Sequence, residues 1–338
     1  MKKRRPVVAA ALMLVVLALL VPAVAGSLMA GPTRIAAPDV WNALTGRAHD
    51  AEHVLIVRDL RLPRIVLALV VGSSLAVAGA IMQGVTRNPL ASPTIAGLTG
   101  GGTLGLLLAM LWLPQAGQLG MIAASFLGAL VAVLSVYAIG ARARAGLDAE
   151  RLALAGLMIS VLCGSVTAML VFEYDMVTAL LSWLLGGLAN LAWPQVWPLL
   201  PVFALGMLLA LALSPQITVL NLGADVARGL GQRTQLVVFG SLAAVLLLAG
   251  GAISVAGPIA FVGLFVPHLV RFAVGYDYRF VVPLSALVGS LFLLVADTIC
   301  RSATQGVFEI PVGLLTTLIG LPFFLVLARA ATGRGELS

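Results

Sequence analysis

Residues 221–234 of the chain read Asn-Leu-Gly-Ala-Asp-Val-Ala-Arg-Gly-Leu-Gly-Gln-Arg-Thr, and this polar insert separates two long stretches without charge. The uncharged stretches are residues 193–213 before the insert and residues 236–266 after it. Each is long enough to cross the roughly 30 Å hydrocarbon core of a bilayer, which needs about 20 apolar residues in a helix. The insert therefore lies at a membrane surface between two spanning segments.

The insert carries its own apolar pattern. Leu222, Val226 and Leu230 recur at a spacing of four residues, and Asp225 and Arg228 stand between them. If the insert is helical, this spacing places the three apolar side chains on one face. A short amphipathic segment at a membrane surface is either a plain connecting loop or a docking element for a partner, and these residues alone leave both open.

The composition of the whole chain is that of a membrane protein. Of its 338 residues, 61% are hydrophobic and 10% are charged, whereas soluble domains carry roughly 25% charged residues. Apolar runs of about 20 residues recur along the chain, which predicts an all-α polytopic fold in one transmembrane domain at residues 1–338. The formal charge of +7 suits basic loops beside anionic lipid and requires no nucleic acid partner.

The scarcity of lysine excludes several chemistries. Lys2 and Lys3 are the only lysines, so the chain has no Walker-type Gly-Lys-Ser/Thr loop and no lysine for a Schiff base in the membrane. Any ATP and magnesium that the protein uses would be bound by another chain. Cys163 and Cys300 lie inside apolar runs and are too few for a disulfide framework or a metal site. We expect no catalytic residue, no metal ion and no cofactor in this chain.

Hydropathy divides the chain into about ten spanning helices. Residues 33–62 are expected to form a polar external loop, and residues 173–190 an external segment with a helix too short to cross the bilayer. The insert at residues 221–234 falls on the inside. The expected spans are residues 7–28, 65–85, 94–112, 118–139, 152–172, 193–213, 235–256, 259–274, 280–300 and 308–327.

The distribution of basic residues orients this layout. Fourteen of the 20 lysines and arginines fall in inside loops or at the ends of the chain, which is the bias of cytoplasmic segments. Both termini are therefore expected in the cytoplasm. Ala23-Val24-Ala25 also resembles a signal-peptidase site, but the apolar run before it is longer than a usual signal core, which favours a first spanning helix.

Two patterns leave alternatives open. His49 and His53 are four residues apart, so on a helix they would face one metal ion, although two histidines alone are usually solvated side chains. The third span is rich in glycine between Gly97 and Gly105, which permits close helix packing. A phosphate-binding loop is the competing interpretation of these glycines, and it would need a preceding soluble strand.

A short internal echo indicates two related halves. Ala78-Gly79-Ala80-Ile81 precedes one proline-rich turn, and Gly250-Gly251-Ala252-Ile253 precedes another. By the span count, the first stretch runs inward and the second outward. An inverted internal repeat of this kind places a transport pathway at the repeat interface or the subunit interface.

Six motifs together resemble the permease subunits of ATP-driven importers for iron–siderophore complexes, haem and vitamin B12. They extend over residues 60–325 and are specific as a set. They are Arg61-Leu-Pro-Arg64, Gln83-Gly-Val-Thr-Arg-Asn-Pro-Leu-Ala91, Leu222-Gly-Ala-Asp-Val-Ala-Arg-Gly-Leu-Gly231, Gly257-Pro-Ile-Ala-Phe-Val-Gly-Leu-Phe-Val-Pro-His-Leu-Val-Arg271, Ala296-Asp297 and Glu309-Ile-Pro-Val-Gly313.

The resemblance implies an assembly and roles for particular residues. It implies a vitamin B12 permease-like fold of ten helices in the bacterial inner membrane, a homodimer or pseudo-dimer, two separate ATPase subunits and an extracytoplasmic binding protein. The ATPase-coupling segment would be residues 220–234, with Leu222, Asp225, Val226, Arg228 and Leu230. The cytoplasmic gate would be Asn88 and Leu90, and the external gate helix would lie in residues 173–190.

The same resemblance assigns Arg61, Arg64 and Arg301 to receive acidic groups of the binding protein. From the sequence alone, lipid headgroup contact is the alternative for these external arginines. Asp297 and Arg301 are four residues apart on one helical face, so a local ion pair between them is expected. For His268, a structural hydrogen bond is favoured over a proton relay or a haem ligand.

The substrate is not determined by these motifs, because siderophore, haem and B12 permeases share them. Residues 173–190 contain Glu173 and Asp175 but no arginine, so no clamp for haem propionates is visible and a siderophore is favoured. An ion-coupled secondary transporter and an intramembrane protease are the competing classes. Both would need ionisable groups at the membrane midplane, and most spans have none.

Overall fold

A computed structural model describes residues 5–47, 50–93, 97–141, 149–184, 187–189, 191–303 and 310–335. Within these ranges the chain is helical and contains no β-strand, so the strand that a phosphate-binding loop needs is absent from them. The described part has seven helices long and apolar enough to cross a membrane and three shorter apolar helices. Together they account for the expected set of about ten spans, and the predicted fold class is confirmed.

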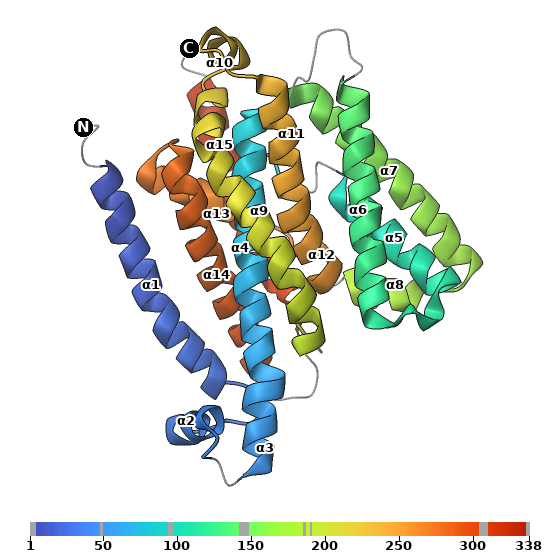
Figure 1. Ribbon diagram of the computed structural model, residues 1–338, viewed down its shortest axis with the longest axis vertical. Helices are drawn as coiled ribbons and strands as arrows, with labels where there is room; N and C mark the ends of the chain where they lie inside the picture. The colour runs from blue at the N-terminus through green and yellow to red at the C-terminus, as the bar shows by residue number, and fades with distance from the viewer. Residues whose placement is uncertain are drawn as a thin grey trace.

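The helices follow one another with short connections (Figure 1). In chain order they are α1 (Arg5–Met29), α2 (Ala37–Thr45), α3 (Ala51–Val54), η2 (Leu55–Arg61), α4 (Leu62–Thr86), α5 (Leu98–Trp112), η4 (Pro114–Ala116), α6 (Gly117–Ala141), α7 (Ala149–Glu173), α8 (Val177–Leu184), α9 (Trp193–Leu220), α10 (Ala224–Gly229), α11 (Thr234–Val245), η5 (Leu246–Gly250), α12 (Gly251–Ala256), α13 (Val262–Val274), α14 (Tyr278–Ala303) and α15 (Val312–Gly335).

Helix α4 is the centre of the fold. Nearly all of its residues are buried, and it packs against α9, α11, α13 and α14. Glycines permit this packing: a Cβ on Gly72 would lie 2.3 Å from the backbone oxygen of Gly289, and one on Gly79 would lie 1.8 Å from that of Gly263. Backbones in such direct contact are typical of membrane bundles, because lipid provides no hydrophobic drive for larger side chains to associate.

The segment expected as a polar external loop, residues 33–62, is largely helical. Helices α3, η2 and α4 form one continuous helix of 36 residues, Ala51–Thr86, which is about 54 Å long and exceeds the roughly 30 Å hydrocarbon core. The join is a π-helical stretch in which the Leu62 N–H donates to the Val57 carbonyl. Pro63 lacks an N–H, and the change of hydrogen-bond register just before it lets the helix continue through that position.

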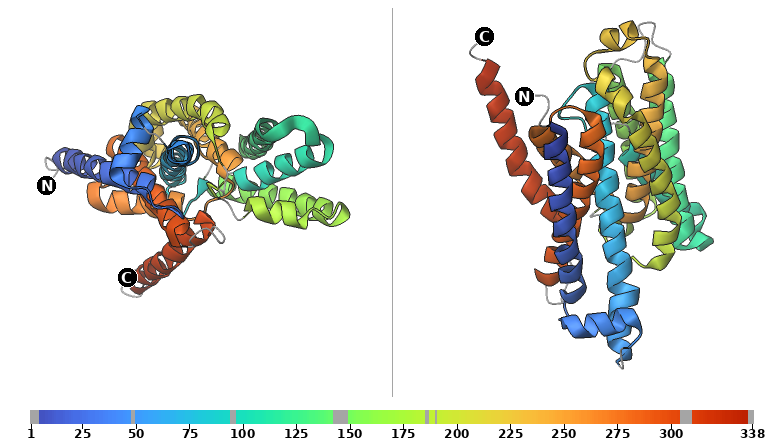
Figure 2. Two further views of the ribbon diagram at one scale, coloured as in Figure 1. Left: turned by 90° about the horizontal axis from the view of Figure 1, so that it is seen from below. Right: turned by 60° about the vertical axis from the view of Figure 1, so that its left-hand side comes forward.

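The bundle has two ends and two lobes. One end carries α2 and is here called the α2 end; the other carries α10 and is called the α10 end (Figure 1). Helix α1 begins and α15 ends toward the α10 end (Figure 2). Helices α5–α8 form a lobe beside the group that surrounds α4, and the two lobes meet mainly where α12 and η5 contact α5 and α6.

The observed helices differ in detail from the expected spans. Helix α9 continues to Leu220, seven residues beyond the expected end, through Pro215. Helix α13 begins at Val262, because Phe261 before it adopts a left-handed conformation with φ 67°. Helices α4 and α11–α12 run in opposite directions side by side, as expected for the two stretches of the internal echo.

Candidate functional site

The polar insert forms a protruding helix at the α10 end. Helix α10 has Gly223 before it with φ 132° and Gly231 after it with φ 78°, so each side turns sharply at a glycine. The Gln232 side chain donates to the Gln216 carbonyl of α9 at 3.0 Å and ties the end of the insert back to the bundle. The insert is therefore fixed to the bundle and is not a freely moving loop.

The apolar stripe of the insert faces away from the protein. Leu222, Val226 and Leu230 are 68%, 48% and 69% exposed, while Ala227 between them is fully buried. Asp225 and Arg228 pair with each other at 2.6 Å on the exposed surface. A plain connecting loop at a membrane surface would gain by turning its leucines inward, so this stripe favours the docking alternative.

The turn after α4 lies next to this insert. Asn88 accepts a hydrogen bond from the Leu90 N–H at 2.9 Å on its Oδ1, which closes a short Asx turn. Asn88 and Leu90 are both exposed. Arg87 has φ 53°, and its guanidinium lies 3.9 Å from where a Cβ on Gly223 would stand, so the turn and the insert are neighbours. The two elements that the resemblance assigned to gating and coupling thus lie at the same end.

A cavity of about 760 Å³ opens where the two lobes meet. Its wall comes from α4 and the turn after it, from α5 and α7, and from the α12–α13 connection, and none of the lining residues that the structure describes is charged. Phe261, with its strained backbone, forms part of the wall and packs closely against Gly320 of α15. The cavity can accommodate a bulky molecule and offers it apolar contacts, with hydroxyls of Ser92, Thr99 and Ser160 as the polar exceptions.

At the α2 end, the three arginines predicted to dock a binding protein are buried. Arg61, Arg64 and Arg301 are 4%, 8% and 4% exposed. Arg61 donates to the carbonyls of Leu28 and Thr33. The chain therefore uses these side chains to tie its own elements together.

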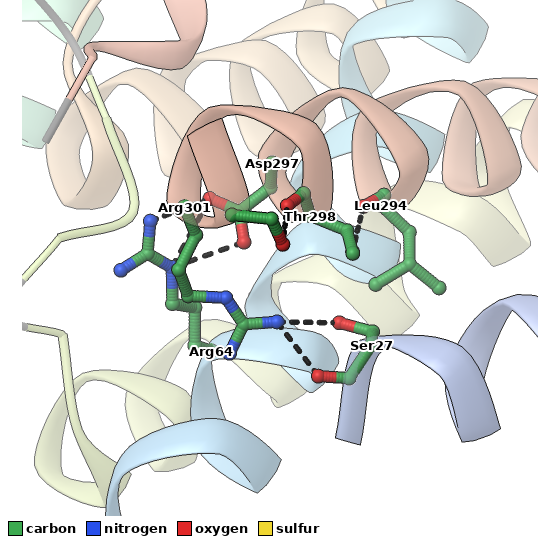
Figure 3. A network of polar contacts seen from close by, with 7 residues as sticks. Ser27, Arg64, Leu294, Asp297, Thr298 and Arg301 are labelled. Carbon is green, nitrogen blue, oxygen red and sulfur yellow. Dashed lines mark hydrogen bonds and ion pairs between the residues drawn. The ribbon is translucent and has the colours of Figure 1, made fainter. Parts of the chain in front are cut away.

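The local ion pair predicted between Asp297 and Arg301 is not the contact that holds the Asp297 carboxylate. Asp297, 1% exposed, instead accepts from Arg64 of α4, with Nη2–Oδ1 at 2.8 Å and Nε–Oδ2 at 3.0 Å (Figure 3). Arg301 points to α1, where its Nη2 donates to the carbonyl and the hydroxyl of Ser27, both at 2.8 Å (Figure 3). These contacts join α1, α4 and α14.

Sequence reasoning missed the Arg64–Asp297 pair because 233 residues separate its members. No local spacing signals such a contact. The only available sign was an intramembrane acid and an arginine at the start of another span, each of which needs a partner. Which arginine served was decided by the packing of α4 on α14.

The structure describes two of the three histidines, His53 and His268. His268 of α13 has no hydrogen-bond partner on Nδ1 among the residues that the structure describes, and a structural hydrogen bond through its other ring nitrogen stays a prediction. Its ring instead meets Phe323 edge-on, with centroids 5.7 Å apart. His53 lies beside Asp50 at 3.6 Å, and His49 lies outside the described residues. In the described ranges, no group of three metal-ligating side chains comes together.

The segment expected to be external, residues 173–190, contains a short helix, α8, at Val177–Leu184. Leu181 of α8 is 52% exposed, and Glu173 and Asp175 before it are also exposed. Asp175 adopts φ 51°, which turns the chain from α7 into α8. Residues 185, 186 and 190 of the predicted gate segment lie outside the described part.

The chain resembles known transport proteins over nearly its whole length. The model of the FecCD transport family matches residues 14–330. The chain is 41% identical over 303 residues to the iron(3+)-hydroxamate import system permease protein FhuB of Bacillus subtilis (strain 168), which covers 90% of this chain and 79% of that protein. It is 40% identical over 282 residues to the Fe(3+) dicitrate transport system permease protein FecC of Escherichia coli (strain K12), covering 81% and 83%.

Two further similarities concern a different cargo and a solved structure. The cobalamin import system permease protein BtuC of Halobacterium salinarum is 41% identical over 279 residues, covering 81% of this chain and 73% of that protein. A solved chain described as a metal-chelate type ABC transporter in an inward-facing conformation superposes with a TM-score of 0.81 at 29% identity, covering 94% of this chain and 98% of that one. The chain belongs to the FecCD transport family and is a transmembrane permease subunit of an ATP-binding-cassette importer.

Proposed function

We propose that two copies of this chain form the membrane pathway of an importer that carries an iron chelate into the cytoplasm, powered by two ATPase subunits. The main support for this proposal is the exposed apolar stripe along α10 and its two ends, formed by Leu222, Val226 and Leu230. An apolar stripe on a short, tethered helix at one end of a membrane bundle suits a groove on a partner protein. The α10 end would then face the cytoplasm, together with both chain termini.

The cavity favours a neutral, bulky cargo. The part of its wall that the structure describes carries no charged side chain, so a polycarboxylate such as ferric citrate or the propionates of haem would meet no countercharge among those residues. Ferric iron bound by three hydroxamate groups has no net charge at its centre and fits such a wall. We therefore favour a hydroxamate-type siderophore complex as the cargo, with ferric citrate, haem and cobalamin as the alternatives.

The α2 end is proposed to receive the extracytoplasmic binding protein. Docking through Arg61, Arg64 and Arg301 would require a rearrangement at this end, because the chain itself now bonds all three. A salt-sensitive response of ATPase activity to the binding protein would be the expected sign of charge pairing. Reversal of Arg61 to Glu should abolish that response. Because the variant also loses the Arg61 contacts to the carbonyls of Leu28 and Thr33, its basal ATPase activity serves as the measure of correct folding. An identical titration in mutant and wild type would exclude the pairing.

The test of function uses proteoliposomes containing the permease with its ATPase subunit and binding protein. ATP-dependent uptake of a radioiron hydroxamate complex is expected, with ferric citrate, haem and labelled cobalamin as competing cargoes. The double variant Val226→Asp, Leu230→Asp should lose uptake and ATPase binding, because it places two carboxylates in an apolar groove. Arg228→Gln keeps the apolar stripe and changes only the polar side of the same helix, so it separates the contribution of the stripe from that of the charges. Uptake at the wild-type level in the double variant would refute the coupling role, and uptake of cobalamin alone would refute the cargo.

A further inference from the structure

The α10 end of helix α13 holds a buried arginine that the chain satisfies only in part. Arg271 lies in the last turn of α13 and is 6% exposed. The Tyr278 phenol approaches its guanidinium as a hydrogen-bond neighbour, but neither Nη1 nor Nη2 has an acceptor at full hydrogen-bond distance among the residues that the structure describes. Because buried donors are nearly always satisfied, these N–H groups suit an additional acceptor from outside the chain.

The groups around Arg271 are suited to an anion. His268, one turn earlier, has a buried Nδ1 that also has no partner within the described ranges. The Tyr276 ring lies over the guanidinium, with Cζ 5.8 Å from the ring centroid, and the Tyr278 phenol lies beside it. Asp277 is engaged elsewhere, since Arg279 donates to both of its oxygens at 3.0 and 2.9 Å. Several donors without an acceptor match a group with several oxygens, such as phosphate.

The site lies at the border of the apolar spans. The Tyr278 N–H donates to the Thr218 hydroxyl at 2.9 Å, and Thr218 is in the last turns of α9, directly before the α10 insert. Tyr276 is 62% exposed and follows Gly275, which turns the chain with φ 82°. Exposed tyrosines of this kind are typical of the level of lipid headgroups.

The outer surface of α13 continues the site toward the membrane interior. Leu269 and Phe272 are 45% and 90% exposed and stand close in sequence to Arg271 on the same helix. They provide an apolar surface below the headgroup level, where acyl chains would lie. Helix α1, which packs against α13, begins at Arg5 and follows Lys2-Lys3-Arg4 in the sequence, and a basic cluster of this kind attracts an anionic membrane surface.

We propose that Arg271, His268 and Tyr276 form a binding site for the phosphate of an anionic phospholipid, with its acyl chains along Leu269 and Phe272. Basic pockets between helices on the cytoplasmic side of membrane proteins bind such headgroups. Arginine suits phosphate because its planar fork donates two parallel hydrogen bonds. The site would fasten α13 to one leaflet at the end that carries α10, and it does not depend on which cargo the protein imports.

The experiment measures lipid retention. The full-length protein is placed in nanodiscs of phosphatidylcholine alone or of an equal mixture with phosphatidylglycerol, then released and examined by native mass spectrometry. The wild type should retain phosphatidylglycerol, and Arg271→Gln should retain it at least about tenfold more weakly, as expected for loss of a charge-assisted hydrogen bond. Arg279→Gln is the matched control, since Arg279 is an exposed arginine at the same end with a partner in the chain.

A second variant and a second probe complete the test. Arg271→Lys keeps the charge and the fold but removes the fork, so it should also weaken retention, and it serves if Arg271→Gln does not fold. The midpoint temperature of thermal unfolding of the wild type should rise in the phosphatidylglycerol mixture, and it should not rise when inorganic phosphate is added in detergent. Equal retention by the wild type and both Arg271 variants would overturn the site, and stabilisation by inorganic phosphate alone would overturn its assignment to a lipid.

Discussion

Replacing Asp297 by asparagine removes the carboxylate that Arg64 bonds inside the helix bundle. The pair is almost fully enclosed, with Asp297 1% exposed and the Arg64 side chain 10% exposed. The contact is bidentate, with Nη2–Oδ1 at 2.8 Å and Nε–Oδ2 at 3.0 Å. Removing one member of such a pair leaves an uncompensated buried charge, which costs about 3–5 kcal/mol. We therefore expect Asp297→Asn to lower the stability of the permease by about that amount.

The double variant Arg64→Met, Asp297→Leu separates the charge from the packing. Replacement of a buried ion pair by apolar residues of similar volume is often neutral or stabilising. The double variant should therefore recover most of the stability that Asp297→Asn loses. The stability changes of the two substitutions would then not add. Such non-additivity is expected of two side chains in direct contact, because the effects of substitutions at independent sites add.

The assay is thermal unfolding of the purified permease in one detergent, followed by tryptophan fluorescence. Asp277→Asn is the control, since Asp277 is paired with an exposed arginine and should change the midpoint little. A midpoint for Asp297→Asn equal to that of the wild type would refute the role of the pair as a brace between α4 and α14. So would a double variant less stable than Asp297→Asn.

Three further predictions concern other parts of the molecule. Gly79→Val would push a side chain into the α13 backbone, where even a Cβ would lie 1.8 Å from an oxygen. The variant should therefore yield less folded protein from the membrane, as measured by size-exclusion chromatography. A yield of folded protein equal to that of the wild type would contradict the contact. Asn88→Cys should cross-link two copies in a nucleotide-dependent way if this exposed turn lines the inner gate of a homodimer, and an absence of cross-links in every nucleotide state would count against it. The pKa of Asp277 is held below its usual range, chiefly by the side-chain hydrogen bond from Arg279. The contribution of Asp277 to stability is therefore present above the unfolded pKa of about 3.9 and is lost as pH falls through the lower folded pKa. The stability of Asp277→Asn should not show this loss when it is measured against falling pH. Parallel curves of stability against pH for the variant and the wild type would exclude the contribution.

The order and approximate limits of the apolar spans follow from the hydropathy of the chain alone. The transfer of a segment into lipid depends on the side chains of that segment alone, so a local count of apolar residues suffices. The amphipathic insert was equally visible, because the four-residue spacing of Leu222, Val226 and Leu230 is a local pattern. The structure added that this stripe is exposed at one end of the bundle.

The partners of the polar groups inside the membrane, in contrast, depend on how the helices pack in three dimensions. Arg64 meets Asp297 across 233 residues, and Arg301 meets Ser27 across 274, while Asp297 and Arg301, four residues apart, were the pair that spacing favoured. The continuation of α4 through Pro63 likewise depends on a π-helical register that no hydropathy count detects. The reason is that a buried charge costs several kcal/mol wherever it lies, and which helix supplies its partner depends on the backbone contacts that glycines such as Gly72 and Gly79 allow.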